Sequence, residues 1–236
     1  STQTTTSTGA SGTGKAPVDA GTYYVKATAA ASSNYNAVTS SCVAHKINKK
    51  SIAGTWGSPT SFTYNGSAQA PSITTPVTGA GSEKLNLTRT TGTNVGSYTS
   101  TASCSSVTGG RAKCTNYTLT GNTKAFTINK ANSSISLTVK TATYTGSAIA
   151  ANKATVTGTT GAVTYTYYTN STCTTQTTTS TGASATGGAP IDAGSYYVKA
   201  TAAASSNYNA VTSSCVAHTI NKKSVGVTWG STTSFK

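Results

Sequence analysis

The sequence predicts an all-β protein made of tandem β-sandwich domains, and composition, periodicity and an internal repeat all lead to this class. The chain has 236 residues with 13 Tyr, 23 Gly and no Met. Polar and apolar residues alternate with a period of two, as at Val163, Tyr165 and Tyr167. Such alternation is typical of half-buried strands, and the Gly, Asn and Ser between these runs favour turns. Short strands in units of this size favour a sandwich.

The long repeat has an offset of 173 residues, from position 21 to position 194. Residues 21–51 recur as residues 194–224 with two differences, and the match runs without a gap from Gln3 to Phe62 of the first copy. A fixed period of related segments is the signature of a repeat architecture. We therefore expect the two copies to adopt the same local structure.

A shorter repeat divides the long one into two module types. The tripeptide Ile-Asn-Lys begins at Ile47, Ile128 and Ile220, and each time it runs within a few residues into the next predicted strand. The absence of a Gly/Ser-rich or Pro-rich spacer predicts domains placed end to end. The predicted parts are a C-terminal half of an A-type module (1–50), a complete B-type module (51–130), a complete A-type module (131–222) and the first strand of a further B-type module (223–236).

Each module has landmarks in the same order. In module A we expect an opening strand on which Ile135, Leu137 and Val139 share one face. Later in each module, a short turn precedes a strand that begins with Gly, a small polar residue and Tyr, as in Asp192 to Tyr196. This turn is similar to the tyrosine corner of immunoglobulin-like domains, in which a Tyr hydroxyl bonds back to the backbone. The residues in that role would be Tyr23, Tyr98 and Tyr196.

The chain resembles the MBG/YDG-type immunoglobulin-like repeats of large bacterial surface proteins and adhesins. The residues that carry the resemblance cover essentially the whole chain: Tyr64-Asn65-Gly66, Tyr144-Thr145-Gly146, Asp192-Ala193-Gly194-Ser195-Tyr196 and Phe126-Thr127-Ile128-Asn129-Lys130. The resemblance implies a secreted, surface-anchored, repetitive stalk, and it brings no catalytic residues with it.

Five cysteines follow the repeat. Cys42 and Cys215 occupy the same repeat position, and the counterpart of Cys173 would lie just before Ser1. Each complete module then has two cysteines, and paired cysteines in small exported domains are typical of disulfides. We predict Cys104–Cys114 and Cys173–Cys215 bonds, with Cys42 bonded to a cysteine upstream of Ser1. Metal binding is the competing interpretation, and the sequence offers neither a C-x-x-C motif nor a nearby His pair for it.

The sequence holds little that could perform catalysis. It contains three acidic residues, Asp19, Asp192 and Glu83, and two histidines, which are one repeat position seen twice. It lacks the motifs of nucleophilic hydrolases, zinc proteases, P-loops and dinucleotide-binding folds. We therefore predict a non-enzymatic protein with no cofactor and no metal.

The charge balance leaves two interpretations open. Lys and Arg number 17 against 3 acidic residues, for a net charge of +14. Such a charge attracts anionic polymers such as cell-wall polyphosphates or acidic glycans. The basic residues are dispersed, however, and Lys on outward strand faces also keeps sheets soluble and blunts their edges. We do not expect nucleic acid as a partner, and no apolar run is long enough to span a membrane.

The sequence thus predicts an extracellular, cell-surface structural repeat region, a stalk or filament whose disulfide-stapled modules act as spacers. The alternative is a multivalent binding module for anionic cell-wall polymers or glycans. The expected partners are further repeats or other copies of the same protein. Because residues 1–50 and 223–236 are parts of modules, we expect them to be completed either by continuation of the repeat or by strand exchange between copies.

Overall fold

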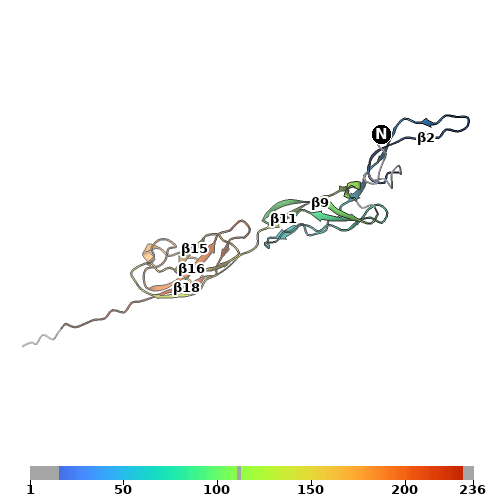
Figure 1. Cartoon of the computed structure of the whole chain (residues 1–236). Helices are drawn as coiled ribbons and strands as arrows, with labels where there is room; N and C mark the ends of the chain where they lie inside the picture. The colour runs from blue at the N-terminus through green and yellow to red at the C-terminus, as the bar shows by residue number, and fades with distance from the viewer. Residues whose placement is uncertain (1–15, 111–112, 231–236) are drawn as a thin grey trace, which may run out of the picture. The chain divides into compact units, whose positions relative to one another are not determined.

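A computed structural model of the chain describes residues 16–110 and 113–230 (Figure 1). Strands account for 45% of the residues and helix for 3%, so the all-β prediction is confirmed. The described helical residues form short 3₁₀ turns, η2 (Cys114–Asn116) and η3 (Thr179–Thr181). The chain divides into two compact units. The first contains the described residues up to Phe62 together with Gly66–Ile128, and the second contains Thr63–Asn65 together with the described residues from Asn129 onward.

Module B supplies the main sheet of the first unit. Its five strands lie in the order β6 (Ser61–Thr63), β11 (Thr123–Asn129), β9 (Gly96–Thr108), β8 (Lys84–Arg89) and β7 (Val77–Thr78). A second, two-stranded sheet pairs β5 (Lys50–Ala53) in parallel with β10 (Tyr117–Thr120). The strand that opens module B is thus paired with a strand near the end of the same module.

Alternating residues of these strands form one hydrophobic core. Leu85 and Leu87 are buried on β8, and the residues before and after this pair are exposed. The core also contains four buried residues from outside β8: Ile52, Ile73, Ala102 and Tyr117. Two-residue periodicity places the strand residues of this set on one face of each strand, and Ile73 joins them from outside the strands. Removal of these side chains from water drives the packing.

The segment before module B forms two small sheets in the same unit. β1 (Gly21–Val25) pairs antiparallel with β4 (Val43–Ile47), and β2 (Thr28–Ala29) pairs antiparallel with β3 (Val38–Thr39). Nearly every side chain of these four strands is exposed or half-buried.

Module A forms the second unit. Its main sheet follows the order β13 (Lys140–Thr143), β18 (Val216–Asn221), β16 (Gly194–Ala202) and β15 (Val163–Tyr168), and β17 (Val211–Thr212) also pairs with β16. A two-stranded sheet pairs β12 (Ser134–Ser136) with β14 (Thr155–Thr157).

The central strand β16 lies between β15 and β18, and one of its faces is fully buried. Val198, Ala200 and Ala202 are each 0% exposed, and Tyr196 is 6% exposed. Ile220 of β18 completes this part of the core at 2% exposed. Two-residue periodicity places these alternate side chains of β16 on one face of the sheet, and that face is buried.

Two predicted strands differ in the structure. The expected opening strand of module A ends at Ser136, and Val139 is 61% exposed between β12 and β13 because the chain leaves one sheet there and enters another. Residues 222–230 carry no strand, and Val225 and Trp229 are 86% and 92% exposed. The remaining parts of the predicted terminal segments, residues 1–15 and 231–236, lie outside the described residues.

Candidate functional site

The described residues contain two disulfides, one in each compact unit. Cys104 in β9 is bonded to Cys114, which begins η2, with a Cα–Cα distance of 5.7 Å. Cys173 is bonded to Cys215, immediately before β18, with a Cα–Cα distance of 5.9 Å. Both distances are ordinary for a disulfide. Cys42 is a free, exposed thiol within the described part of the chain, and its expected bond to a cysteine upstream of Ser1 stays a prediction.

The three tyrosines expected at corners make the same local contact. The hydroxyl groups of Tyr23 and Tyr98 donate hydrogen bonds to the backbone carbonyls four residues earlier, at 2.8 and 2.7 Å. The Tyr196 hydroxyl lies 3.1 Å from the corresponding carbonyl oxygen of Asp192. Burial raises the pKa of Tyr196, and the negative charge of Asp192 acts in the same direction. Each of these hydrogen bonds thus fixes the turn that precedes the strand on which the Tyr lies, β1, β9 or β16.

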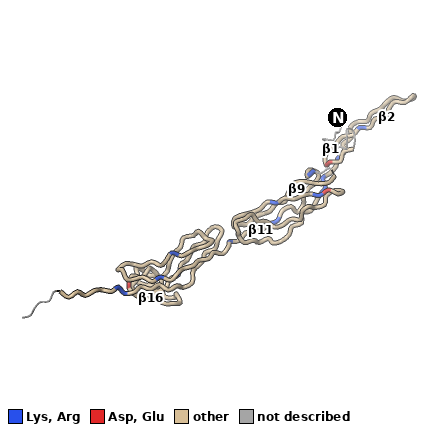
Figure 2. Tube along the Cα trace, turned by 60° about the horizontal axis from the view of Figure 1, so that its bottom comes forward, with Lys and Arg blue, Asp and Glu red and all other residues tan. Residues whose placement is uncertain are grey.

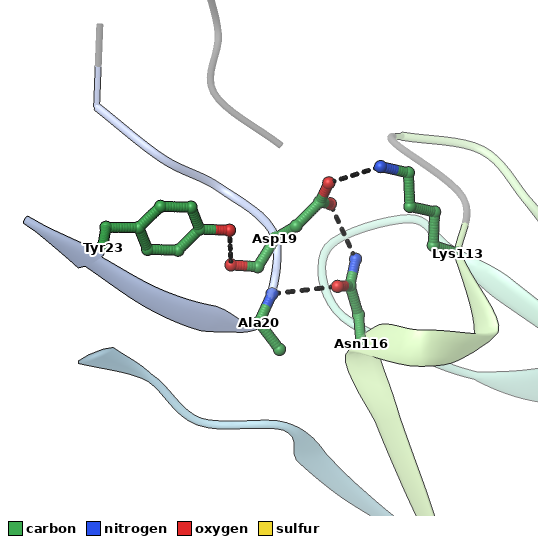
Figure 3. A network of polar contacts seen from close by, with 5 residues as sticks. All are labelled: Asp19, Ala20, Tyr23, Lys113 and Asn116. Carbon is green, nitrogen blue, oxygen red and sulfur yellow. Dashed lines mark hydrogen bonds and ion pairs between the residues drawn. The ribbon is translucent and has the colours of Figure 1, made fainter. Parts of the chain in front are cut away.

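The turn before β1 contacts module B through a compact polar network (Figure 3). The two carboxylate oxygens of Asp19 accept hydrogen bonds from Lys113 Nζ at 2.7 Å and from Asn116 Nδ2 at 3.0 Å. Asn116 also uses its Oδ1 to accept the backbone N–H of Ala20 at 2.9 Å. Asp19 is 6% exposed, whereas the Lys113 side chain is 48% exposed. We call these four residues, Asp19, Ala20, Lys113 and Asn116, the junction clamp.

The clamp joins segments of different modules. Asp19 and Ala20 belong to the A-type half-module, and Lys113 and Asn116 lie at the η2 end of module B, where the disulfide from Cys104 anchors the loop. A carboxylate that accepts hydrogen bonds from both a cation and an amide is well satisfied despite its burial. The clamp therefore adds polar contacts between the turn before β1 and the η2 end of module B.

The strand that leaves the half-module makes the second part of the junction. β5 follows β4 directly and enters the core of module B, where Ile52 is 9% exposed. Trp56 packs against the same core, and its indole N–H donates to the Gly121 carbonyl at 2.9 Å. Lys50 donates to the Gly79 carbonyl at 2.8 Å. Burial of one large aliphatic side chain contributes about 1.5–3 kcal/mol, so Ile52 is a substantial anchor.

A cleft of about 360 Å³ lies beside the junction clamp in the same unit. Its polar lining is occupied by local contacts: the Tyr117 hydroxyl donates to Glu83 and accepts the backbone N–H of Ala80. Burial raises the pKa of Tyr117, and the contact with the Glu83 carboxylate raises it further. These groups hold each other in place, so the cleft presents a structural packing contact rather than an acid and a base directed at a substrate.

One titratable group is fully buried in module A. His218 of β18 is 0% exposed and lies edge-on to the Tyr167 ring at a centroid distance of 5.4 Å. Neither ring nitrogen makes a hydrogen bond of good geometry to the described residues. Burial lowers the pKa of His218, and the positive charge of Lys140 lowers it further, whereas the backbone of Ile149 opposes the shift. The imidazole is therefore held neutral.

The structure offers little for metal or membrane chemistry. Within residues 16–110 and 113–230, no three His, Cys, Asp or Glu side chains are grouped so that they could hold a metal ion. None of the helices in that part of the chain has the length and apolar character needed to cross a membrane.

Sequence reasoning placed the tyrosine corners but missed the junction clamp. Asp19 and Glu83 are two of the three acidic residues of the chain, and the sequence alone assigns neither of them a partner. An Asn-Tyr pair occurs in both modules, at Asn116-Tyr117 and Asn207-Tyr208, and its recurrence is the signal that could have pointed to a contact. The partner of Asp19 lies more than ninety residues away, and a lone Lys in a polar loop carries no sequence mark of its role.

No protein-family model matches this chain, and a comparison with curated proteins finds no match to its sequence. The resemblance to MBG/YDG-type repeats therefore stays a prediction.

Proposed function

We propose that this chain is a structural repeat region of a bacterial extracellular surface protein, in which tandem immunoglobulin-like modules form a stalk or filament and act as disulfide-stapled spacers. In this role the chain has no catalytic task and no cofactor. Its partners are further repeats or other copies of the same protein, and its location is the cell surface.

The observation that carries the proposal is the way one module passes into the next. The Ile-Asn-Lys segment at Ile47 continues within three residues into β5, which is part of the core of module B. The junction clamp adds an ion pair and two hydrogen bonds at the same place. A junction built from a short connection into β5 and from buried polar contacts limits bending between neighbours, which is what a spacer requires.

The two disulfides support a load-bearing role. Cys173–Cys215 encloses a sequence separation of 42 residues and Cys104–Cys114 one of 10. In a chain pulled from its ends, these loops cannot extend while the bonds are intact. Disulfides in thin-cored exported domains also stabilise the fold by restricting the unfolded chain.

Single-molecule stretching tests this proposal. We expect discrete unfolding events for the two complete modules. Reduction should lengthen the module A event by about 150 Å and the module B event by about 35 Å, at about 3.5 Å per released residue. The Cys42→Ser variant is the matched control and should leave both lengths unchanged. Smooth extension without discrete events would contradict a load-bearing spacer.

Solution scattering provides an independent check. A compact globule of this length has a radius of gyration of about 18 Å. End-to-end modules should exceed this value clearly, and a measurement at the compact limit would argue against a stalk.

The net charge of +14 favours a second candidate, multivalent binding to anionic cell-wall polymers or glycans. Figure 2 shows the Lys and Arg residues scattered through both units rather than gathered in one cluster. Scattered cations give weak, screened attraction that multiplies over many repeats. Binding to polyphosphate beads that is lost as salt rises toward molar concentration supports this candidate, whereas salt-resistant binding to one defined sugar would require a specific pocket.

A further inference from the structure

The end of module A that bears Asp192 repeats the sequence of the half-module that contacts module B. Residues 16–20 read Ala-Pro-Val-Asp-Ala and residues 189–193 read Ala-Pro-Ile-Asp-Ala. Asp192 occupies the position of Asp19, yet it is exposed, whereas Asp19 is 6% exposed beneath Lys113 and Asn116. The same carboxylate position is thus seen with and without a module against it.

The segment that follows module A repeats β5 and Trp56. Residues 220–225 read Ile-Asn-Lys-Lys-Ser-Val, against Ile-Asn-Lys-Lys-Ser-Ile at residues 47–52. Val225 and Trp229 occupy the positions of Ile52 and Trp56, and they are 86% and 92% exposed. Two large apolar side chains exposed so fully on one short segment are costly to leave in water, so the segment is suited to burial against a partner.

We propose that the Asp192 turn and residues 223–229 together form a docking surface for a B-type module that follows in the same chain. The occupant is defined by what contacts the equivalent parts of the first copy, Asp19, Ala20 and β5, in this molecule. It supplies a Lys and an Asn at the positions of Lys113 and Asn116 and a parallel strand at the position of β10. This inference rests on the proposed spacer function and deepens it by naming the partner of each module A end.

The first copy gives the contacts that the docked surface should make. Asp192 takes the hydrogen bonds from Lys Nζ and Asn Nδ2 that Asp19 accepts at 2.7 and 3.0 Å. The Ala193 N–H donates to the Asn side chain, as Ala20 does at 2.9 Å. The Lys223 ammonium takes the carbonyl contact of Lys50, and Trp229 enters the apolar site of Trp56. Anionic and cationic groups therefore face each other around an apolar centre.

The chain contains so few Asp and Trp residues that their NMR signals can test this docking surface. Asp19 and Asp192 are its two aspartates, and Trp56 and Trp229 are its two tryptophans. The experiment compares the native chain with an extended chain in which residues 1–222 are followed by a second copy of residues 50–130. NMR of ¹³C-labelled Asp reports the carboxyl groups, and indole ¹H–¹⁵N signals report the tryptophans.

In the extended chain we expect the Asp192 carboxyl signal to move to a position near that of Asp19. The indole signal of the Trp that follows module A should become like that of Trp56, and the Ala193 amide should become protected from hydrogen exchange. Asp192→Asn should make the Ala193 amide exchange at least several-fold faster and should leave exchange at the Ala20 amide unchanged. Asp19→Asn is the matched control and should affect Ala20 alone.

The Asp192 carboxyl and Ala193 amide signals test the docking surface. The indole signal tests the continuous repeat on which the proposed function rests. If the new Trp is buried but the Asp192 carboxyl and Ala193 amide do not change, the clamp at this end is wrong and the spacer function stands. If that Trp stays exposed although the added module is folded, the continuous repeat itself is wrong. If the native chain self-associates in a concentration-dependent manner that Asp192→Asn abolishes, the occupant is a second copy, and the version within one chain is overturned.

Discussion

Two copies of almost the same sequence, residues 21–51 and 194–224, adopt different structures in this molecule. In the second copy β16 has nine residues and alternate side chains are buried, whereas in the first copy β1 has five residues and its apolar residues are largely exposed. Val25 is 57% exposed and its counterpart Val198 is 0% exposed. The local sequence therefore specifies a strand, but the strands beside it specify its length and burial.

The neighbours responsible are identifiable. In module A, β16 pairs with β15 and β18, and β18 pairs in parallel with β13. In the first copy, β1 pairs with β4, the counterpart of β18, in a sheet of two strands. The antiparallel pairing of Tyr23 with His45 matches that of Tyr196 with His218, so register is retained even where burial is lost. Strand pairing here thus follows the local sequence, whereas burial of the side chains in a core does not.

The largest difference between the copies should come from the cysteines. Replacing Cys173 and Cys215 by Ser removes a crosslink with a sequence separation of 42. Restriction of the unfolded chain by such a loop stabilises a domain by about 4 kcal/mol, which the variant should lose. Urea unfolding of module A, followed by Tyr fluorescence, measures this loss.

The matched control for that variant is Cys42→Ser, because Cys42 has the same sequence context and is an exposed thiol. We expect it to change the free energy of unfolding by less than about 0.5 kcal/mol, as is usual for exposed positions. Equal losses in the two variants would show that the disulfide contributes no stability specific to module A.

The next largest effect concerns one buried valine. Val198→Ala should lower the free energy of unfolding of module A by about 1–3 kcal/mol, because the side chain is fully buried between neighbouring strands and leaves a cavity. Val25→Ala should have almost no effect, since its side chain is more than half exposed. Differential scanning calorimetry compares the two, and a similar loss for both would mean that the first copy has a core of its own.

The comparison also shows how far sequence reasoning can reach. Alternation correctly indicated the strand that carries Val163, Tyr165 and Tyr167, and composition and periodicity correctly indicated that the chain is all-β. The expected strand through Val139 was too long because alternation continues across a point where the chain changes sheets. Such a change depends on the position of β18, which is far away in sequence, so a local pattern cannot reveal it.

The junction clamp illustrates the same limit for the site. Cysteine spacing and Asp-x-Gly-x-Tyr motifs are local patterns, and both point to positions that make regular contacts in the structure. The partnership of Asp19 with Lys113 depends instead on how the η2 end of module B meets the preceding turn. No periodicity marks a single contact of this kind, which is why it appears only when the strands have been placed.

A smaller, pH-dependent effect should distinguish the two histidines. The pKa of His218 is lowered by burial, so the unfolded chain takes up a proton near pH 6.5 while the folded module does not. The stability that the neutral ring provides is therefore complete above about pH 6.5 and is lost as the pH falls, by at most about 1.4 kcal/mol per pH unit. Urea unfolding of module A between pH 7.5 and pH 5 measures this slope.

The substitution His218→Leu should remove the slope, whatever it does to stability at pH 7, because it removes the titrating group. His45→Leu should leave the slope intact, since the His45 side chain is exposed. These two residues are the only histidines of the chain, and the acidic side chains titrate at lower pH in general. A slope that persists in His218→Leu would mean that another group buries its charge on folding.

The smallest effect should come from the junction clamp. Asp19→Asn removes the charge that Lys113 contacts and leaves an amide that can still hydrogen-bond to Asn116. Because Lys113 is 48% exposed, solvent screens the ion pair and the expected loss is about 1 kcal/mol or less.

The sharper readout is hydrogen exchange at the Ala20 amide, which donates to Asn116 and should exchange several-fold faster in the variant. Raising the salt concentration should produce part of the same acceleration in the unmodified chain, because salt screens partly exposed charges. Asp192→Asn should leave the Ala20 amide unaffected and should not change stability in the native chain, since the Asp192 side chain is exposed. If Asp19→Asn left the Ala20 amide as protected as before at every salt concentration, the ion pair would contribute nothing to the junction, and β5 alone would hold the two modules together.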